Sequence, residues 1–271
     1  MAIINATPDS FWVGSRTGDS RDYNALREAV ADRAERAVAE GAAILDVGGC
    51  STRPGADEVP ADEELHRVCV AVEAIRERWP AMPVSIDTWR ASVARGVMER
   101  FGPCVVNDIS AGELDPQMIP FVAETGAPYI AMHMRGNPST MASMVDYEDV
   151  AREVEEYFVH KLAALERAGV RRVVVDPGFG FAKTTAQNYA LLRALPRLAA
   201  LGRPLLAGLS RKSMIWKALG GTPETALAGT CALNWQALCG GAQILRVHDV
   251  REAVEIVKLF EYYNDTSERN S

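Results

Sequence analysis

The chain has 271 residues, 48% of them hydrophobic, and a formal net charge of −7. This length suits one large domain, such as a barrel of about 250 residues. The acidic balance, without any basic stretch, excludes an extended nucleic-acid surface. No apolar run reaches the roughly 20 residues of a membrane span, and no signal peptide precedes the first apolar run. We therefore expect a cytoplasmic protein that binds neither nucleic acid nor membranes.

The cysteines also favour the cytoplasm. Their number is odd, they are scattered, and they form no CxxC pair, which predicts small buried residues in a reducing compartment rather than disulfides or a zinc site. They are Cys50, Cys69, Cys104, Cys231 and Cys239.

Short apolar runs alternate with helical patterns along the whole chain. The runs predict strands at 2–5, 44–49, 84–88, 105–108, 129–133, 173–176, 205–209 and 244–248. Apolar residues at helical spacing predict helices near 26–38, 65–79, 91–100, 117–124, 147–168, 187–198, 227–238 and from 250 onward. The polar residues 264–271 are expected to form a disordered tail.

Strand–helix units in this order, without a linker or a repeated module, predict a single (β/α)₈ barrel over residues 1–263. An open, doubly wound sheet is the alternative. It usually has fewer strands and an early GxGxxG turn, which this chain lacks. In a barrel, the strands end at a common rim, and the loops beyond that rim form the active site.

The stretch 173–183 is the clearest such strand end. Three valines lead directly into Asp176, and a turn with Pro, Gly and two phenylalanines follows. Valines without polar alternation predict a strand buried on both faces. Asp176 then either caps the next element or belongs to a functional site. We expect Phe181 to face a substrate, Phe179 to pack in the core, and Lys183 to be a solvated loop charge.

Polar side chains gather at the predicted rim in larger number than capping requires. Carboxylates and amides together suit the edge of a planar, nitrogen-rich heterocycle, which presents donors and acceptors in alternation. The rim residues are Asn5, Asp87, Asn107, His133, Asp176, Lys212, Arg246 and His248, with Thr52 and Arg53 just beyond the second strand. A purely structural explanation does not account for six of them taken together, namely Asp87, Asn107, Asp176, Lys212, Arg246 and His248.

The cationic members of this set predict an anion site. Arg246 and His248 are two positions apart, so a strand would present both on one face. Lys212 adds a further positive charge. Ser210 is expected at a helix start, where free backbone N–H groups favour a carboxylate or a phosphate.

Two polar residues allow a structural role. His133 is either a hydrogen-bonded core residue or a site residue, and Asp46, inside its strand, is expected to form a structural pair near the barrel core. The sequence contains no metal-ligand cluster of His, Cys or Glu. A metal would thus be a hard cation such as Mg²⁺, held by Asn5 or Asp9 together with phosphate.

These motifs resemble those of the dihydropteroate synthases, a family of pterin-binding barrels. The resemblance covers essentially the whole chain in the family's order, and its motifs, among them Asp176-Pro177-Gly178-Phe179-Gly180-Phe181, are together highly specific. Cys50 departs from it, because the family usually has Glu there, and so does the loop 11–16. The matching segments are 4–11, 46–49, 51–55, 85–88, 107–112, 132–136, 176–181, 208–213 and 246–250.

The resemblance implies a transferase that condenses 6-hydroxymethyl-7,8-dihydropterin diphosphate with 4-aminobenzoate, giving 7,8-dihydropteroate and diphosphate. It also implies Mg²⁺ on Asn5, a homodimer, and sulfonamides in the aminobenzoate pocket. We expect an SN1-like path, because the site is rich in charge stabilisers and has no obvious nucleophile or general base.

The resemblance also implies a role for each site residue. The pterin would be held by Asp87, Asn107, Asp176 and Lys212, with Thr52 close by, and the diphosphate by Arg246 and His248. Aminobenzoate would lie near Arg53, Pro54, Phe181 and Ser210. Met132 and Gly208 complete the substrate-binding set, and the catalytic residues would be Asp87, Asp176, Lys212, Arg246 and His248.

Two other functions remain open at this point. A barrel that passes a methyl group from methyltetrahydrofolate to a corrinoid would share the pterin-binding residues. It would have no reason to keep Ser210-Arg211-Lys212 together with Arg246-Val247-His248 as an anion site. The second alternative is a pterin-binding homologue that has lost its catalytic activity.

Overall fold

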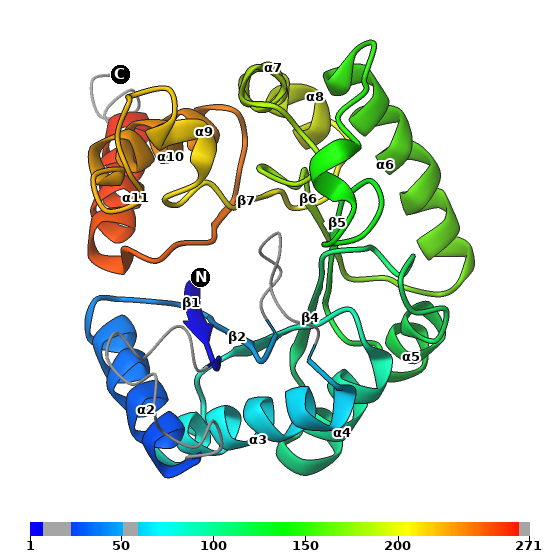
Figure 1. Ribbon diagram of the computed structural model, residues 1–271, viewed down its shortest axis with the longest axis vertical. Coiled ribbons are helices and arrows are strands. Elements are labelled where there is room, and N and C mark those ends of the chain that lie inside the picture. The colour runs from blue at the N-terminus through cyan, green and yellow to red at the C-terminus, as the bar shows by residue number, and fades with distance from the viewer. Residues whose placement is uncertain (8–22, 51–58, 266–271) are drawn as a thin grey trace.

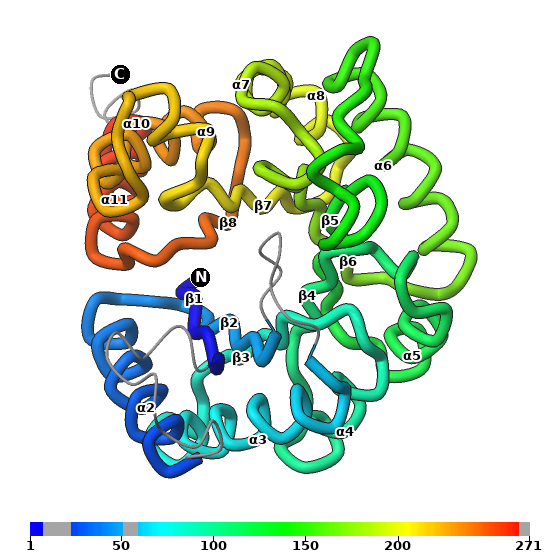
Figure 2. The backbone as a smooth tube through the Cα atoms, in the orientation of Figure 1, coloured from blue at the N-terminus to red at the C-terminus, as the bar shows by residue number. Residues whose placement is uncertain are grey.

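The computed structural model describes residues 1–7, 23–50 and 59–265. Within these residues, parallel β-strands alternate with α-helices (Figures 1 and 2). The eight predicted strands are confirmed, although β7 and β8 contain only two residues each. They are β1 (Ala2–Asn5), β2 (Leu45–Gly48), β3 (Val84–Asp87), β4 (Val105–Asp108), β5 (Tyr129–Met132), β6 (Val173–Asp176), β7 (Leu206–Ala207) and β8 (Ile244–Leu245).

The strands form two parallel sheets rather than one continuous eight-stranded sheet. Six of them follow the order β1-β2-β3-β4-β5-β6, and β7 pairs with β8. Isolated parallel bridges connect the two sheets, one between Ala2 and Val247 and one between Val175 and Leu205. The predicted α/β class with a parallel sheet is therefore confirmed.

Helices surround the strands on the outside of the molecule (Figure 1). The helix expected at 187–198 is divided in two, because Pro196 at the start of the second segment has no N–H to continue the first. The last helix continues through Asp265, so Asn264 is helical instead of starting the expected tail, and residues 266–271 lie outside the described residues. The helices are α2 (Tyr23–Ala39), α3 (Ala61–Arg78), α4 (Ala91–Phe101), α5 (Met118–Thr125), α6 (Val150–Arg167), α7 (Thr185–Arg193), α8 (Leu195–Ala199), α9 (Ser213–Trp216), α10 (Leu227–Cys239) and α11 (Val250–Asp265), with a 3₁₀ turn, η1 (Met141–Ser143).

The register of the sheet places the predicted site residues at one level. Asn5 pairs with Gly48, Gly48 with Asp87, and Asp87 with Asn107. Side chains alternate along a strand, so Asp46 lies on the same face as Gly48, one step further from the carboxyl ends. The opposite face is apolar and packs against the helices. Parallel pairing thus gathers the polar strand ends on one side of the sheet.

A hydrogen-bonded turn after β4 holds the end of that strand in place. The Asp108 carboxylate accepts hydrogen bonds from the N–H groups of Ser110 and Gly112 at 2.8 and 2.7 Å and from the Tyr129 hydroxyl at 2.7 Å. Burial raises the pKa of Asp108, and these hydrogen bonds oppose the rise. Asp108 therefore has a structural role, whereas the preceding residue, Asn107, lies on the opposite face of the strand, toward the site.

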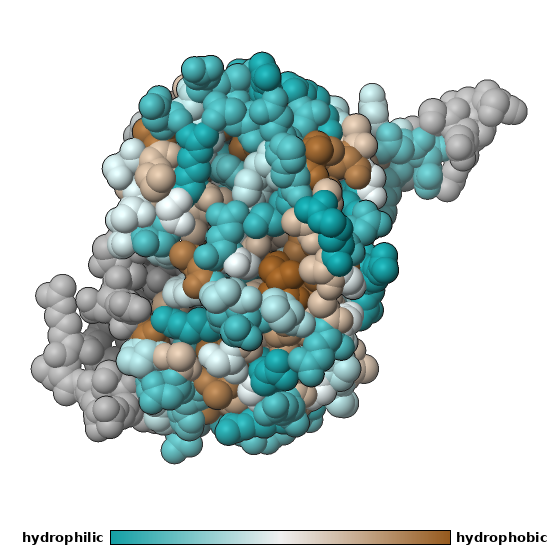
Figure 3. Space-filling model, turned by 90° about the vertical axis from the view of Figure 1, so that its right-hand side faces the viewer, coloured by the Kyte–Doolittle hydropathy of each residue, from teal (hydrophilic) through white to brown (hydrophobic). Residues whose placement is uncertain are grey.

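Hydrophilic residues cover most of the face shown in Figure 3, the side of the molecule that carries α5 and α6 in Figure 1. Apolar residues form separate, small patches there. No helix in the described part of the chain is both long and apolar enough to cross a membrane.

Candidate functional site

Five of the predicted site residues lie near one another at the carboxyl ends of the strands. Asp87, Asn107 and Asp176 end or nearly end β3, β4 and β6, while Lys212 and Arg246 follow β7 and β8. Arg246 attracts both Asp87 and Asp176, and Lys212 does the same. The fold therefore brings together acidic and basic groups that are far apart in the chain.

Arg246 makes the central contact of this group. Its Nε donates a hydrogen bond to Asp46 at 2.6 Å, and its Nη2 donates one to Asp87 at 2.5 Å. Asn107 donates a further hydrogen bond to Asp46 at 3.1 Å. Asp46 is completely buried, so the structural pairing expected of it is confirmed. Its partner, 200 positions away in the chain, could not be identified from spacing.

Two carboxylates thus share one guanidinium. Burial acts to lower the pKa of Arg246, but attraction to Asp46 and Asp87 outweighs burial and raises that pKa. Burial raises the pKa of Asp87 to about 7 despite the attraction of Arg246, and repulsion from Asp46 adds to the rise. Asp87 can therefore hold or release a proton near neutral pH.

Asp176 and Lys212 form the other charged pair of the site. Asp176 accepts a hydrogen bond from the Gly178 N–H at 2.8 Å, and Lys212 donates one to the backbone oxygen of Phe179. Burial raises the pKa of Asp176, and the attraction of Lys212 opposes this rise. Burial lowers the pKa of Lys212 to about 8, and Asp176 opposes that shift. Both groups are largely removed from water, which strengthens any interaction they make with a ligand.

The loop after β6 brings its backbone close to both neighbouring loops. A Cβ on Gly178, whose φ is +69°, would lie 2.0 Å from the His133 oxygen, so only glycine fits there. Phe179 is completely buried, which confirms its packing role. The ring of Phe181 lies 5.0 Å from Lys212 Nζ, a position that keeps this aromatic beside the charged pair. Its contact with a substrate stays a prediction.

Lys183 contradicts the prediction of a solvated loop charge, because it is only 8% exposed. Its Nζ lies 3.1 Å from His133 Nδ1 and 3.0 Å from the backbone oxygens of both Gly178 and Phe181. The loop folds back over the end of β5, so these acceptors surround the ammonium group. His133 is itself buried and hydrogen-bonded, as the core alternative for this residue predicted.

His248 differs from the positive charge expected of it. Burial lowers the pKa of His248 to about 4, and repulsion from Arg246 adds to the effect. Its Nδ1 lies 3.2 Å from the hydroxyl oxygen of Ser210. The imidazole is therefore neutral at pH 7 and would bind an anion as a hydrogen-bond donor.

The helix start expected at Ser210 is also displaced. The helix α9 begins at Ser213 and has only four residues. Ser210 is instead a buried acceptor, because the backbone N–H of His248 donates to its hydroxyl at 3.1 Å. Arg211, with φ at 55°, turns away to form an ion pair with Asp249 at 2.8 Å. No helix N-terminus is therefore available at Ser210 to bind an anion.

The remaining predicted residues occupy less central positions. Asn5 is half-buried at the end of β1, and its side chain makes no hydrogen bond to a described residue. Met132 is buried in a small apolar cluster next to Phe181, and Gly208 follows β7 near Lys212 Nζ. Thr52, Arg53, Pro54 and Asp9 lie outside the described residues.

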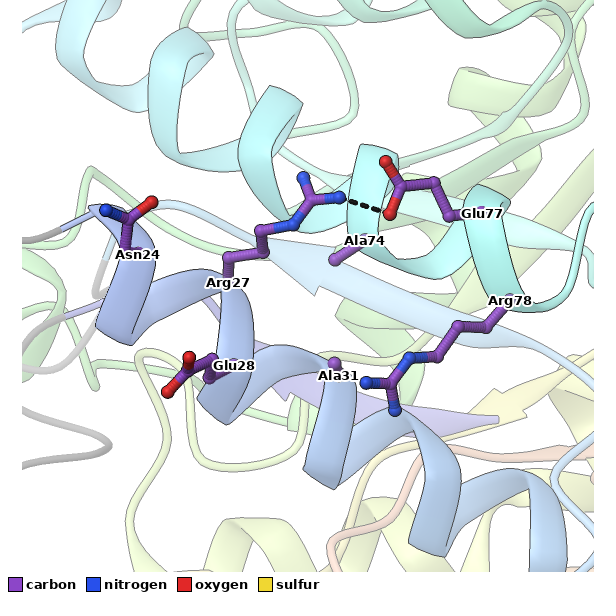
Figure 4. Close-up of a pocket in the computed structure, with 7 residues that line it drawn as sticks. All are labelled: Asn24, Arg27, Glu28, Ala31, Ala74, Glu77 and Arg78. Atoms are coloured by element: carbon purple, nitrogen blue, oxygen red, sulfur yellow. Dashed lines mark hydrogen bonds and ion pairs between the residues drawn. The ribbon is translucent and has the colours of Figure 1, made fainter.

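A surface pocket of about 340 Å³ lies elsewhere, between α2 and α3 (Figure 4). Arg27 in its wall forms ion pairs with Glu77 and, at 2.7 Å, with Glu73. These charges neutralise one another and face water, so they offer little to a ligand. The lining residues are Asn24, Arg27, Glu28, Ala31, Ala74, Glu77 and Arg78.

Comparison with known proteins identifies the family. The family model for pterin binding enzymes matches residues 1–248. A curated dihydropteroate synthase of Synechocystis is 44% identical over 262 residues, which cover 96% of this chain and 88% of the relative. The chain belongs to the dihydropteroate synthase family.

Solved structures of dihydropteroate synthases have the same fold as this chain. The Xanthomonas albilineans enzyme with 4-aminobenzoic acid superimposes with a TM-score of 0.87 at 39% identity, covering 97% of this chain and 92% of its own. The Yersinia pestis enzyme in a sulfonamide drug complex gives a TM-score of 0.87 at 37% identity, with 97% and 93% covered. The resemblance inferred from the motifs is thus confirmed.

Cys50, which departs from the pattern that the resemblance implies, has surroundings that disfavour the reactive thiolate. Burial raises the pKa of the Cys50 thiol, and the negative charge of Glu64 adds to the rise. A protonated thiol is a poor nucleophile.

Sequence reasoning did not identify Arg246 as the partner of Asp46 in this dihydropteroate synthase site, and it did not predict the burial of Lys183. An ionisable residue inside an apolar strand must find a partner, which is the signal that pointed to Asp46. Lys183 carried no such signal, because a lysine after a Gly-rich turn is ordinarily exposed.

We predict that Asp46→Asn lowers the free energy of unfolding by about 3 kcal/mol, because it leaves the buried guanidinium of Arg246 with only one carboxylate. Urea denaturation followed by circular dichroism measures the change. The matched control is Glu124→Gln, which breaks the exposed ion pair with Arg95 and should have a much smaller effect. Equal losses in the two variants would contradict a central role for the Asp46–Arg246 contact.

Proposed function

We propose that the protein is a dihydropteroate synthase, a transferase that joins 6-hydroxymethyl-7,8-dihydropterin diphosphate to 4-aminobenzoate and releases diphosphate. The observation that carries the proposal is the group of mutually interacting charges on Asp87, Arg246, Asp176 and Lys212 at the strand ends. Its support is the alignment of almost the whole chain with enzymes of that name.

We infer that the eight strands make up one closed (β/α)₈ barrel. The isolated bridges between Ala2 and Val247 and between Val175 and Leu205 support this, because they lie at the two edges where the sheets meet. The Val175 N–H also donates to the Pro204 oxygen at 2.8 Å. In such a barrel the charged group lies at the mouth, where barrel enzymes have their active sites.

The pterin is proposed to bind between Asp176 and Asp87. Its N–H groups suit the carboxylate of Asp176, its carbonyl suits the ammonium group of Lys212, and Asn107 can both donate and accept. Lys212 and Asp176 are both desolvated, so their hydrogen bonds to the ring are strong. Met132 and Gly208 leave an apolar surface and an open backbone on which the ring can lie.

The diphosphate is proposed to bind beside Arg246 and His248. The Arg246 side chain is 21% exposed, and its Nη1 has no acceptor among the described residues. This edge of the guanidinium can therefore reach a phosphate while the other edge stays on Asp46 and Asp87. Neutral His248 can add a hydrogen bond from Nε2.

Asn5 is the described residue that would hold Mg²⁺. Its amide oxygen is a hard donor at the end of β1, two strands from Asp87. Mg²⁺ usually keeps several waters and takes few protein ligands beside phosphate, so a single described ligand fits this ion. When bound, Mg²⁺ supplies charge neutralisation to the diphosphate.

The reaction is proposed to follow an SN1-like path. The bond between the pterinyl methylene carbon and the diphosphate oxygen breaks, and its electron pair leaves with the diphosphate next to Arg246 and His248. The carboxylates of Asp87 and Asp176 stabilise the positive charge left on the pterin. The amine of 4-aminobenzoate then attacks the carbon and loses a proton, for which Asp87, with its pKa raised by burial to about 7, is a suitable acceptor.

Aminobenzoate is proposed to lie between Phe181 and Ser210, near Arg53 and Pro54. The half-buried ring of Phe181 supplies an apolar wall at the edge of the pterin site. By analogy with the Yersinia pestis enzyme in its sulfonamide drug complex, sulfonamides would bind in the same place.

We also propose a cytoplasmic homodimer. All five cysteines are free thiols, as in a reducing compartment. On α11, Leu259 and Tyr262 are 62% and 66% exposed and form an apolar surface that a second copy could cover.

The synthase activity is tested by mixing the purified protein with the pterin diphosphate, Mg²⁺ and 4-aminobenzoate. We expect release of diphosphate with formation of dihydropteroate. In a single turnover without the amine, an SN1-like path should still release diphosphate. Strict dependence of that release on the amine would contradict the path, and pterin binding without any release would contradict the activity.

We predict that Asp176→Asn weakens binding of the pterin diphosphate by about 2 kcal/mol, because a charged hydrogen-bond acceptor is lost. Calorimetric titration measures this loss. Asp149→Asn is the matched control, since Asp149 also accepts backbone N–H groups but caps α6 away from the site. A fall in stability with unchanged binding would show that Asp176 is only a cap.

We predict that sedimentation equilibrium gives twice the chain mass of 29.5 kDa. Leu259→Glu should produce monomers, because it places a charge in the proposed interface. Val159→Glu on α6, where the side chain is also half exposed, should leave the dimer intact. A monomeric native protein would contradict the proposed dimer.

A further inference from the structure

We propose that Lys183 is a positioning residue of this site, which holds the loop 178–181 in the shape that presents Phe181 and Lys212 to the substrates. The inference rests on the proposed synthase activity and assigns this residue a part in binding the second substrate.

The contacts of Lys183 converge on one short segment of backbone. Its Nζ reaches the oxygens of Gly178 and Phe181, the first and last residues of the turn, each at 3.0 Å. The third partner, His133 Nδ1 at 3.1 Å, belongs to the end of β5. One ammonium group therefore fixes both ends of the loop to the neighbouring strand.

The same loop also contacts the charged residues of the site. The oxygen of Phe179 accepts a hydrogen bond from Lys212, whose Nζ also lies 5.0 Å from the ring of Phe181. The N–H of Gly178 donates to Asp176 at 2.8 Å. A shift of this loop would therefore move Phe181 directly, whereas Lys212 and Asp176 are also held outside the loop, Lys212 by the hydrogen bond from its backbone N–H to the Leu209 oxygen at 3.1 Å and Asp176 by its strand.

A buried ammonium group is a costly way to hold a loop. Burial lowers the pKa of Lys183 to about 7, repulsion from Lys212 and Arg135 adds to this, and Asp176 opposes it. Burial also lowers the pKa of His133 to about 2, with Lys183 and Arg135 adding to the shift, so the ring is neutral and its Nδ1 accepts in the tautomer that carries the proton on Nε2. The ring of Tyr157, on α6, packs against His133 with 4.8 Å between centroids.

The protonation state of Lys183 then decides how well the loop is held. The ammonium form has three N–H donors for its three acceptors, whereas the neutral amine has only two. Above pH 7, the contacts to the carbonyl oxygens lose the positive charge that strengthens them, and the loop is held less tightly. The pterin is held mainly by residues on the strand ends, so the effect should fall mostly on 4-aminobenzoate.

The variants Lys183→Met and Lys183→Arg separate positioning from simple stability. Lys183→Met should fold, as judged by circular dichroism, and should raise the KM for 4-aminobenzoate roughly tenfold, a loss typical of a misplaced contact, with little change in the KM for the pterin. Lys183→Arg should restore part of this loss, since a guanidinium can still reach the carbonyl oxygens. Lys217→Met, a change at an exposed lysine, is the control and should behave as the native protein.

The pH profile gives the second measurement. In the native protein the KM for 4-aminobenzoate should rise through a step near pH 7. Lys183→Arg should lack that step, and Lys183→Met should have the raised KM at every pH. A step near pH 8 that belongs to Lys212 should persist in all of them. A native KM and a native profile in Lys183→Met would overturn the proposal.

Binding measurements distinguish failure of this proposal from failure of the synthase activity. If the native protein releases no diphosphate, dissociation constants for 4-aminobenzoate and for the pterin diphosphate replace the KM values. The same split between the two ligands and the same step near pH 7 are expected. Equal weakening of both ligands in Lys183→Met would overturn the positioning role.

Discussion

The contact on which the site depends is the buried guanidinium of Arg246, shared by Asp46 and Asp87. It connects β2, β3 and the end of β8, so it ties the beginning of the chain to its end. Two carboxylates beside one cation leave Asp87 with a raised pKa. Arg246 still has one edge of its guanidinium without an acceptor among the described residues. A single contact therefore links strands from both ends of the chain and leaves part of the guanidinium without a described acceptor.

The second half of the site lies on a loop rather than on the strands. The loop after β6 is anchored by Lys183 on one side and by Lys212 on the other. Lys183 is buried and Lys212 is partly buried beside Asp176, and desolvation lowers the pKa of each. Removing these groups from water is unfavourable, but it leaves oriented donors that need no rearrangement when charge develops. In a member of the dihydropteroate synthase family, such donors suit a reaction in which charge develops on the substrates.

Much of this could be predicted from the pattern of residues. Runs such as 173–175 predict buried strands, because only parallel sheets bury both faces, and the polar residue after each run marks the rim. Asp87 and Asp176 were found in this way. Lys183 and Ser210 were misjudged, because burial and helix starts depend on how loops fold over one another. His248 was expected to be charged, yet burial and repulsion from the nearby Arg246 lower its pKa.

The sequence by itself determined the order of strands and helices, the family and the identity of the residues at the strand ends. These follow from local periodicity and from motifs of adjacent residues, which do not depend on distant parts of the chain. Only the tertiary structure decided which charges meet, which of them lose water, and which carry a proton at neutral pH. Burial and pairing arise between residues as far apart as Asp46 and Arg246, and no local pattern records such distances.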